Sequence, residues 1–205
     1  MSAARLSTLG AGFSDASMGS QAVFRAALQA LSHPGRIVDL PHDAQVPSHG
    51  HAASAALLLA LLDPDCRLWL SPSLAGTDAA PWLRFHTGCV LVDAPAEAQF
   101  AWIASGDATP PLEAFAQGSD TYPDQSTTCV VDVAALTANP AGGWTLSGPG
   151  IQSSAHLAVE GCDADNFVAQ WRANHAAFPR GVDVYLATPR QIVGLPRSTR
   201  IEQEA

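Results

Sequence analysis

The chain has 205 residues, of which 47% are hydrophobic, and its basic and acidic residues sum to a net charge of −9 at pH 7. This hydrophobic content can supply a substantial core, which excludes a disordered chain. A surface with this negative charge disfavours binding to nucleic acid and to anionic membranes.

The first half of the chain alternates helical and extended patterns. Apolar residues at helical spacing predict an amphipathic helix, and an Ala/Leu run predicts a second, buried one that is too short to cross a bilayer. Short β-rich runs and a helix that ends before Gly88 follow. The predicted helices cover 20–31, 52–62 and 80–87, and the predicted strands cover 66–70 and 89–93.

The second half contributes most of the predicted strands, with one helix that an aspartate can cap. The predicted strands cover 100–104, 127–136, 144–147, 151–159, 181–188 and 190–199, and the helix covers 166–178. Helices and strands alternate without a convincing linker, which predicts an α/β fold with a mixed sheet in a single domain over 1–205. We expect 1–11 and 201–205 to be flexible. No signal-peptide pattern is present, so we expect a cytoplasmic protein.

All ten basic residues are arginines, so the chain contains no lysine. This excludes a Walker A lysine, a lysine general base and a lysine aldimine with pyridoxal phosphate. Anion chemistry would have to use arginine, histidine or backbone N–H groups. The four cysteines are widely spaced, which favours free thiols over a zinc or iron–sulfur site.

Three histidines lie close together in sequence, at His42, His49 and His51. A His-x-His pair on an extended segment can direct both rings to one face, so a metal site is one interpretation. The segment is a Pro/Gly loop, however, and solvated histidines are the favoured interpretation. His86 lies near a predicted helix end, where it either interacts with the helix terminus or faces a ligand.

Two turn motifs could bind an anion. In GLPRSTR, the guanidinium of Arg197 with nearby hydroxyls is suited to phosphate or phosphonate, and an exposed polar tail is the competing interpretation. In LSGPGIQS, the N–H groups of Gly148, Gly150 and Ile151 could form an anion-binding nest. A hairpin turn between two strands is the favoured interpretation of the second motif.

Several segments together resemble one protein family. In chain order they are GFSDASMGSQAVFRAALQALSHPG, AALLLALLDPDCRLWL, WLRFHTG, LEAFAQGSDTYPDQSTT, LSGPGI, NHAAFPRGVD and GLPRSTR. The ordered set is similar to the PhnH family, which belongs to the bacterial carbon–phosphorus lyase system of phosphonate catabolism.

The resemblance implies a multi-subunit transferase. Family members act with PhnG, PhnI and PhnL to make α-D-ribose 1-methylphosphonate 5-triphosphate from ATP and methylphosphonate, with release of adenine. They join PhnG, PhnI and PhnJ in a core complex and form a homodimer alone. The implied fold resembles that of pyridoxal-phosphate-dependent transferases without the cofactor function, so no cofactor is expected.

The residues within the family-like segments that suit ligand chemistry form the predicted ligand site. They are Arg25, His33, His86, Gly148, Gly150, Arg197 and Thr199. No catalytic residue and no metal ligand is assigned. Two roles remain open: a subunit that contacts the substrates, or a noncatalytic scaffold with a vestigial cofactor cleft.

Overall fold

The computed structural model describes residues 9–138 and 143–203. Its centre is a seven-stranded sheet in the order β1-β10-β9-β5-β4-β2-β3, and a smaller four-stranded sheet has the order β11-β7-β8-β6. The large sheet is formed by β1 (Val38–Asp39), β2 (Arg67–Leu70), β3 (Val90–Leu91), β4 (Phe100–Ile103), β5 (Thr128–Asp132), β9 (Asp183–Ala187) and β10 (Gln191–Leu195). The small sheet is formed by β6 (Ala135–Thr137), β7 (Trp144–Ser147), β8 (Ala155–Glu160) and β11 (Arg200–Gln203).

The large sheet is mixed, as the sequence predicts. Strands β3, β2, β4, β5 and β9 are parallel, whereas β10 and β1 run antiparallel to their neighbours. The small sheet is antiparallel throughout. The α/β fold and its single domain are therefore confirmed.

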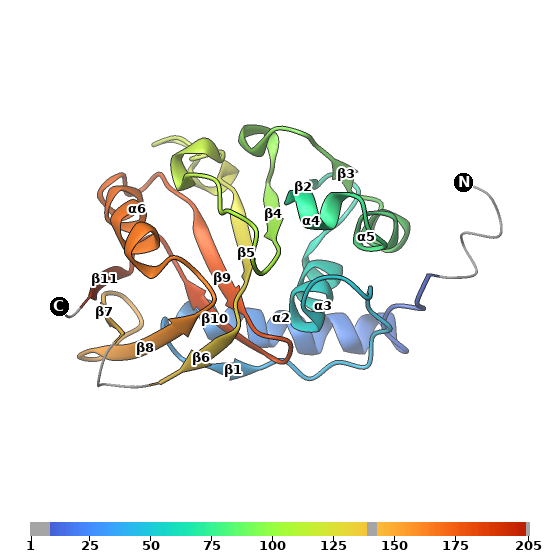
Figure 1. Ribbon diagram of the computed structural model, residues 1–205, viewed down its shortest axis with the longest axis horizontal. Helices are drawn as coiled ribbons and strands as arrows, with labels where there is room; N and C mark the ends of the chain where they lie inside the picture. Colours follow the sequence, from blue (N-terminus) through green and yellow to red (C-terminus); the bar gives the residue numbers. More distant parts are fainter. Residues whose placement is uncertain (1–8, 139–142, 204–205) are drawn as a thin grey trace.

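Helices cover the large sheet on both sides (Figure 1). They are α2 (Ala16–Ser32), α3 (Ala52–Leu61), α4 (Pro72–Ala75), α5 (Ala79–Thr87) and α6 (Ala164–Ala176), with short 3-10 turns η1 (Pro95–Glu97), η2 (Leu112–Ala114) and η3 (Pro123–Gln125). Helices α2, α3 and α5 pack on one face, and α6 and the small sheet pack on the other. In the described part of the chain, no helix combines the length and the apolar character needed to cross a membrane.

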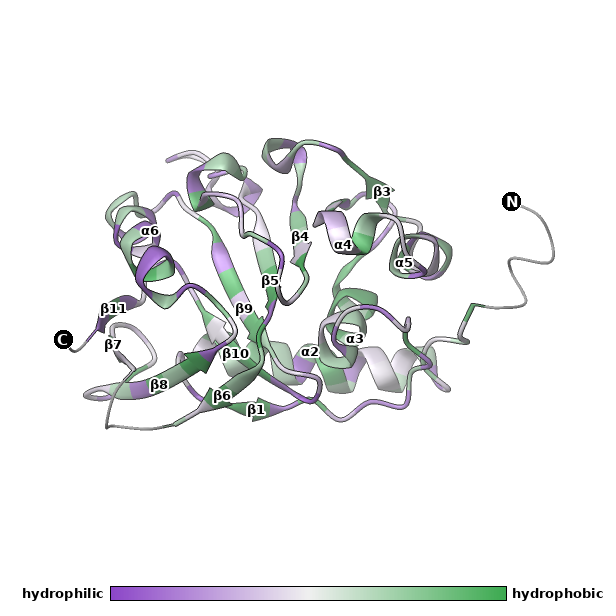
Figure 2. Ribbon diagram, in the orientation of Figure 1, coloured by the Kyte–Doolittle hydropathy of each residue, from purple (hydrophilic) through white to green (hydrophobic). Residues whose placement is uncertain are grey.

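Alternate side chains of the central strands enter two separate cores, because successive residues of a strand point to opposite faces. Val130 and Tyr185 enter the core under α2 and α3. Val131 and Leu186 enter the core under α6 and the small sheet. Hydrophobic colouring on α3 and on parts of the central strands marks this buried layer (Figure 2).

The first helix begins earlier than its apolar pattern predicts. The side chain of Asp15 caps it by accepting a hydrogen bond from the Met18 N–H at 3.0 Å, so α2 starts at Ala16 instead of Ser20. The predicted strand at 127–136 is divided into β5 and β6, and β6 pairs with β8 in the small sheet.

The predicted flexible ends fall partly outside the described residues, at 1–8 and 204–205. The structure differs from the prediction at 201–203, which lie in β11. This strand pairs with β7, and burial of Ile201 in the second core provides the physical reason for its order.

Candidate functional site

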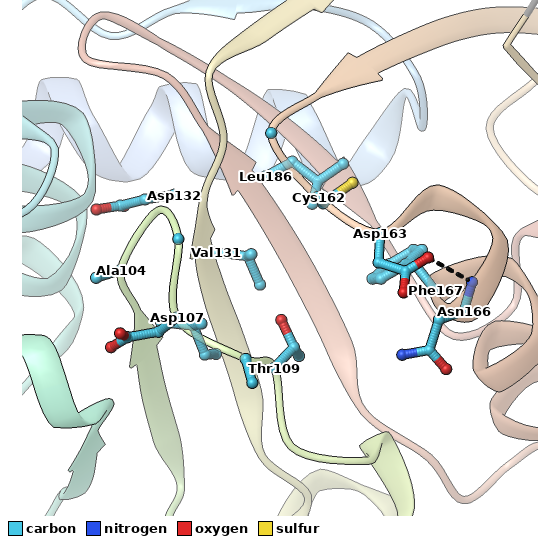
Figure 3. A pocket seen from close by; sticks show the side chains of 14 residues that line it. Ala104, Asp107, Thr109, Val131, Asp132, Cys162, Asp163, Asn166, Phe167 and Leu186 are labelled. Carbon is cyan, nitrogen blue, oxygen red and sulfur yellow. Dashed lines mark hydrogen bonds between the residues drawn. The ribbon is translucent and has the colours of Figure 1, made fainter.

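A cavity of about 420 Å³ lies at the carboxyl ends of β4, β5 and β9, beside the start of α6 (Figure 3). In open α/β sheets this edge is where ligands usually bind. The polar side chains that line it are Asp107, Thr109, Asp132, Cys162, Asp163 and Asn166. The cavity is therefore the site that the fold itself indicates.

Asp132, the last residue of β5, is the most buried carboxylate of the cavity, at 1% exposure. Its side chain accepts hydrogen bonds from the Ser54 hydroxyl at 2.5 Å, the Trp102 indole N–H at 3.0 Å and the His51 N–H at 2.8 Å. Burial raises the pKa of this carboxyl above its ordinary value, although these three donors favour the charged form. Asp132 thus ties α3 to the central strands through neutral donors.

Asp107 lies on the other side of the cavity, in the loop after β4. Its carboxylate accepts hydrogen bonds from the N–H and the hydroxyl of Ser73 at the start of α4, at 2.9 and 2.5 Å. Partial burial opposes ionisation, but hydrogen bonds from Ser71 and Ser73 outweigh it and lower the pKa of Asp107. This carboxylate is charged at neutral pH and joins the loops that follow β2 and β4.

The third carboxylate of the cavity, Asp163, caps α6. Its side chain accepts a hydrogen bond from the Asn166 N–H at 3.2 Å, which the dashed line in Figure 3 marks. Neighbouring Cys162 is not activated, because burial raises the pKa of its thiol. The Asp163 carboxylate therefore occupies the N-terminus of α6, where a ligand anion would otherwise bind favourably.

The cavity lining is acidic. Among the residues that line it in the described part of the chain, none is arginine or histidine. Three carboxylates without a basic side chain suit a hydrogen-bond-donating or cationic group and disfavour a bare phosphate or phosphonate. The lining also does not fit pyridoxal phosphate, because a chain without lysine cannot form its aldimine and, among the described residues, no basic side chain lines the cavity to pair with a phosphate.

None of the predicted ligand-site residues lines this cavity. The structure instead brings four of them together elsewhere, at the turn between β7 and β8. A Cβ added to Gly150 would lie 2.4 Å from the Ser32 carbonyl, next to His33, and a Cβ added to Gly148 would lie 3.0 Å from the Ser198 carbonyl, next to Thr199. The turn is thus packed tightly against the end of α2 and the loop before β11.

The favoured interpretation of LSGPGIQS as a hairpin turn is confirmed. Strands β7 and β8 are antiparallel and pair Leu146 with Ala155, and the Ile151 N–H closes the turn on the Gly148 carbonyl at 3.1 Å. Gly150 has φ +85°, a backbone conformation that favours glycine. One of the N–H groups considered for anion binding is consequently used within the turn.

The other predicted residues lie apart from that turn or point away from it. The exposed Arg25 contacts Gln21 on α2. His86 contacts the Gly10 carbonyl through Nε2 at 2.8 Å and holds the N-terminal segment against α5. Arg197 turns inward to Asp183, with the closest contact at 2.6 Å.

The three loop histidines have separate surroundings. His49 contacts Asp78 at 2.8 Å, His51 donates to the Ala187 carbonyl at 2.9 Å, and His42 has a buried Nδ1 without a hydrogen-bond partner. Over residues 9–138 and 143–203, no group of three or more His, Cys, Asp or Glu side chains is placed to hold a metal ion. The geometry gives the metal interpretation no support.

The cavity residues were missed, although the sequence contains a signal for them. Asp107 follows the predicted strand at 100–104, Asp132 lies within an apolar strand, and Asp163 precedes a predicted helix. Polar residues at the carboxyl ends of neighbouring parallel strands converge in such a fold. Strand order was needed to bring these three positions together.

Fold and site together define a class: an α/β protein with a mixed sheet, an acidic cavity at its carboxyl edge and no lysine for cofactor chemistry. Sequence comparison then identifies the family. A profile of the family described as bacterial phosphonate metabolism protein (PhnH) matches residues 11–202. The chain belongs to the PhnH family.

Two relatives illustrate this relationship. The chain is 40% identical over 194 residues, covering 94% of each chain, to the alpha-D-ribose 1-methylphosphonate 5-triphosphate synthase subunit PhnH of Rhizobium meliloti (strain 1021). It is 32% identical over 187 residues to the putative C-P lyase subunit protein HtxG of Stutzerimonas stutzeri, covering 88% of this chain and 85% of the relative.

Proposed function

We propose that the chain is a subunit of α-D-ribose 1-methylphosphonate 5-triphosphate synthase in the carbon–phosphorus lyase system. In this role it is needed to transfer ribose triphosphate from ATP to methylphosphonate with release of adenine. The observation that carries the proposal is the 40% identity to a synthase subunit over 94% of both chains. The proposed partners are PhnG, PhnI, PhnJ and PhnL, the proposed location is the cytoplasm, and the isolated chain is proposed to form a homodimer.

Two observations favour a structural role in this complex over direct contact with the substrates. The cavity at the carboxyl edge is lined by carboxylates, which repel the phosphate groups of ATP and the phosphonate. The guanidinium of Arg197, the strongest predicted anion ligand, has every N–H bonded to protein oxygens. The ligand site at Arg25, His33, His86, Gly148, Gly150, Arg197 and Thr199 stays a prediction.

We also propose that the large sheet is that of a pyridoxal-phosphate-dependent transferase whose cofactor function is absent. Support comes from the mixed, largely parallel sheet with a cavity at its carboxyl edge. The absence of lysine removes the group that would bind the cofactor covalently.

The test is reconstitution with PhnG, PhnI and PhnL, with and without this chain, followed by incubation with ATP and methylphosphonate. We expect adenine release, measured by chromatography, to require the chain. If the chain has a structural role, its cavity does not contact substrate. A double variant, Asp107→Asn with Asp163→Asn, is therefore expected to retain the wild-type kcat. Full adenine release without the chain would contradict the subunit proposal, and a large fall in kcat with intact assembly would favour substrate contact instead.

A further inference from the structure

Three loops that each contain a proline meet at the amino-terminal edge of the large sheet. We call this region the proline-aromatic surface and define it by Tyr122, Pro123, Phe178, Pro179 and Pro196. Its two aromatic residues are exposed, at 56% for Tyr122 and 62% for Phe178. Single exposed apolar residues are common on protein surfaces, but here Phe178, Pro123, Pro179 and Pro196 line one hollow, and Tyr122 directly precedes Pro123 in the chain.

Arg197 holds these loops together from beneath. Its Nη1 donates to the carbonyls of Pro123 and Pro179, at 2.9 and 3.3 Å, so a single nitrogen joins the two loops that carry the rings. Its Nη2 and Nε bind both oxygens of Asp183, at 2.6 and 3.1 Å. The Arg197 side chain is only 12% exposed, so it acts as an internal brace for this surface.

Two further contacts fix the same loops. The Gly181 N–H donates to the Gln117 carbonyl at 2.9 Å, and Arg180 forms an ion pair with Asp120 at 3.3 Å. Prolines restrict the backbone further. A surface that is rigid before binding loses little conformational entropy on association, which favours tight contact with a partner.

The surface encloses a shallow hollow of about 350 Å³ between Pro123, Phe178 and Pro196. Asp183 at its base is neutralised by Arg197, whereas Asp124 at its rim has no cationic partner among the described residues. An apolar side chain can fill the hollow, and a basic side chain beside it can pair with Asp124. The complementary partner is thus apolar and locally basic.

We infer that the proline-aromatic surface binds another subunit of the synthase, through a segment that presents an apolar side chain next to an arginine or lysine. The inference rests on the proposed function, which supplies the protein partner. A second copy of this chain fits less well, because a two-fold contact through this surface would bring the Asp124 rims of both copies together. Aromatic side chains at such positions are frequent binding hot spots.

The test compares two matched double variants of the full chain. Tyr122→Ser with Phe178→Ser removes the two rings of the proline-aromatic surface. Phe24→Ser with Leu28→Ser removes two apolar side chains of similar exposure, 46% and 51%, from the outer face of α2. Binding of each to the purified assembly of the other synthase subunits is measured by calorimetry, after circular dichroism and thermal unfolding have established that the variants are folded.

We expect the first variant to raise Kd by roughly tenfold or more, and the α2 variant to bind like wild type. Asp124→Arg, which leaves the rings intact, is expected to weaken binding as well and serves as the second test if the double variant is unfolded. Failure of the wild-type chain itself to bind the assembly would contradict the proposed function.

Wild-type binding with unchanged affinity in the Tyr122/Phe178 and Asp124 variants would overturn the inference alone. A loss of binding confined to the α2 variant would overturn it too. Light scattering measures whether the wild-type chain and the Tyr122/Phe178 variant form dimers. If the wild type is a dimer and the variant is a monomer with unchanged affinity for the assembly, the surface joins two copies of this chain. The inference would then be wrong.

Discussion

The two ends of the central strands hold a carboxyl group in different ways: one is buried and the other is partly exposed and paired. At the carboxyl end of β5, Asp132 is surrounded by neutral donors, and burial raises its pKa. At the amino end of β9, Asp183 is paired with the guanidinium of Arg197. The first arrangement surrounds the carboxyl group with neutral donors, whereas the second pairs it with a cation and uses the same cation to join three loops. We call the amino-terminal edge of the sheet, where Arg197 pairs with Asp183, the braced edge. The carboxyl-terminal edge, where Asp132 lines the cavity, is the cavity edge.

The largest expected effect is at the braced edge. Arg197→Ala leaves Asp183 without its counter-ion and the carbonyls of Pro123 and Pro179 without a donor. We expect the free energy of unfolding to fall by about 3 kcal/mol, measured by urea denaturation. Arg197→Lys serves as the control: it keeps the charge but not the planar set of donors, so an intermediate loss is expected. Wild-type stability in Arg197→Ala would show that the brace contributes nothing.

A smaller effect is expected at the cavity edge. Asp132→Asn keeps acceptors for Ser54 and Trp102 but turns an amide donor toward the His51 N–H. The cost at pH 7 is expected to be about 1–2 kcal/mol in urea denaturation. The pH dependence provides a sharper measurement than this single value.

Because the folded-state pKa of Asp132 is raised, the folded protein binds its proton more tightly than the unfolded chain does. The contribution of Asp132 to wild-type stability is fully present below pH 3.8, the ordinary pKa of the group. It is lost as pH rises through the raised pKa of the folded state. The stability difference between wild type and Asp132→Asn should therefore be largest at acidic pH and shrink across this window. A difference that grows with pH would contradict the raised pKa.

The smallest effect is expected for Asp107→Asn, which weakens contacts to Ser73 in a partly exposed loop. We expect a loss of about 0.5 kcal/mol at pH 7. The pKa of Asp107 is lowered, so its stabilising contribution is present above the ordinary value of 3.8 and is lost as pH falls through the folded-state pKa. The two carboxylates of one cavity should thus show opposite pH trends, and parallel trends would refute the distinction.

The sequence predicted the elements well where local pattern decides them. The apolar period of α2, the Ala/Leu run of α3 and the hairpin of β7 and β8 each depend on neighbouring residues, and all three form. Strand β11 was missed because only its pairing with β7, which lies far away in sequence, orders it. The prediction for α2 began late because the cap at Asp15 precedes the apolar pattern.

The site was harder to predict for a similar reason. Arg197 carries the residue type suited to an anion, and its sequence neighbours gave no sign that Asp183, Ser126 and two proline carbonyls would take its donors. Asp107, Asp132 and Asp163 are ordinary acidic residues until the strand order brings them to one edge. Long-range pairing, which composition and periodicity do not encode, determines both outcomes.

The division of the interior into two cores also gives the molecule separate spectroscopic reporters. Trp82 and Trp102 lie in the core under α2 and α3, whereas Trp69, Trp144 and Trp171 lie in the core under α6 and the small sheet. Fluorescence from variants that keep the tryptophans of only one core would follow each side of the sheet independently. Coincident transitions would mean that the sheet couples its two sides into one cooperative unit, and separate transitions would reveal which side yields first.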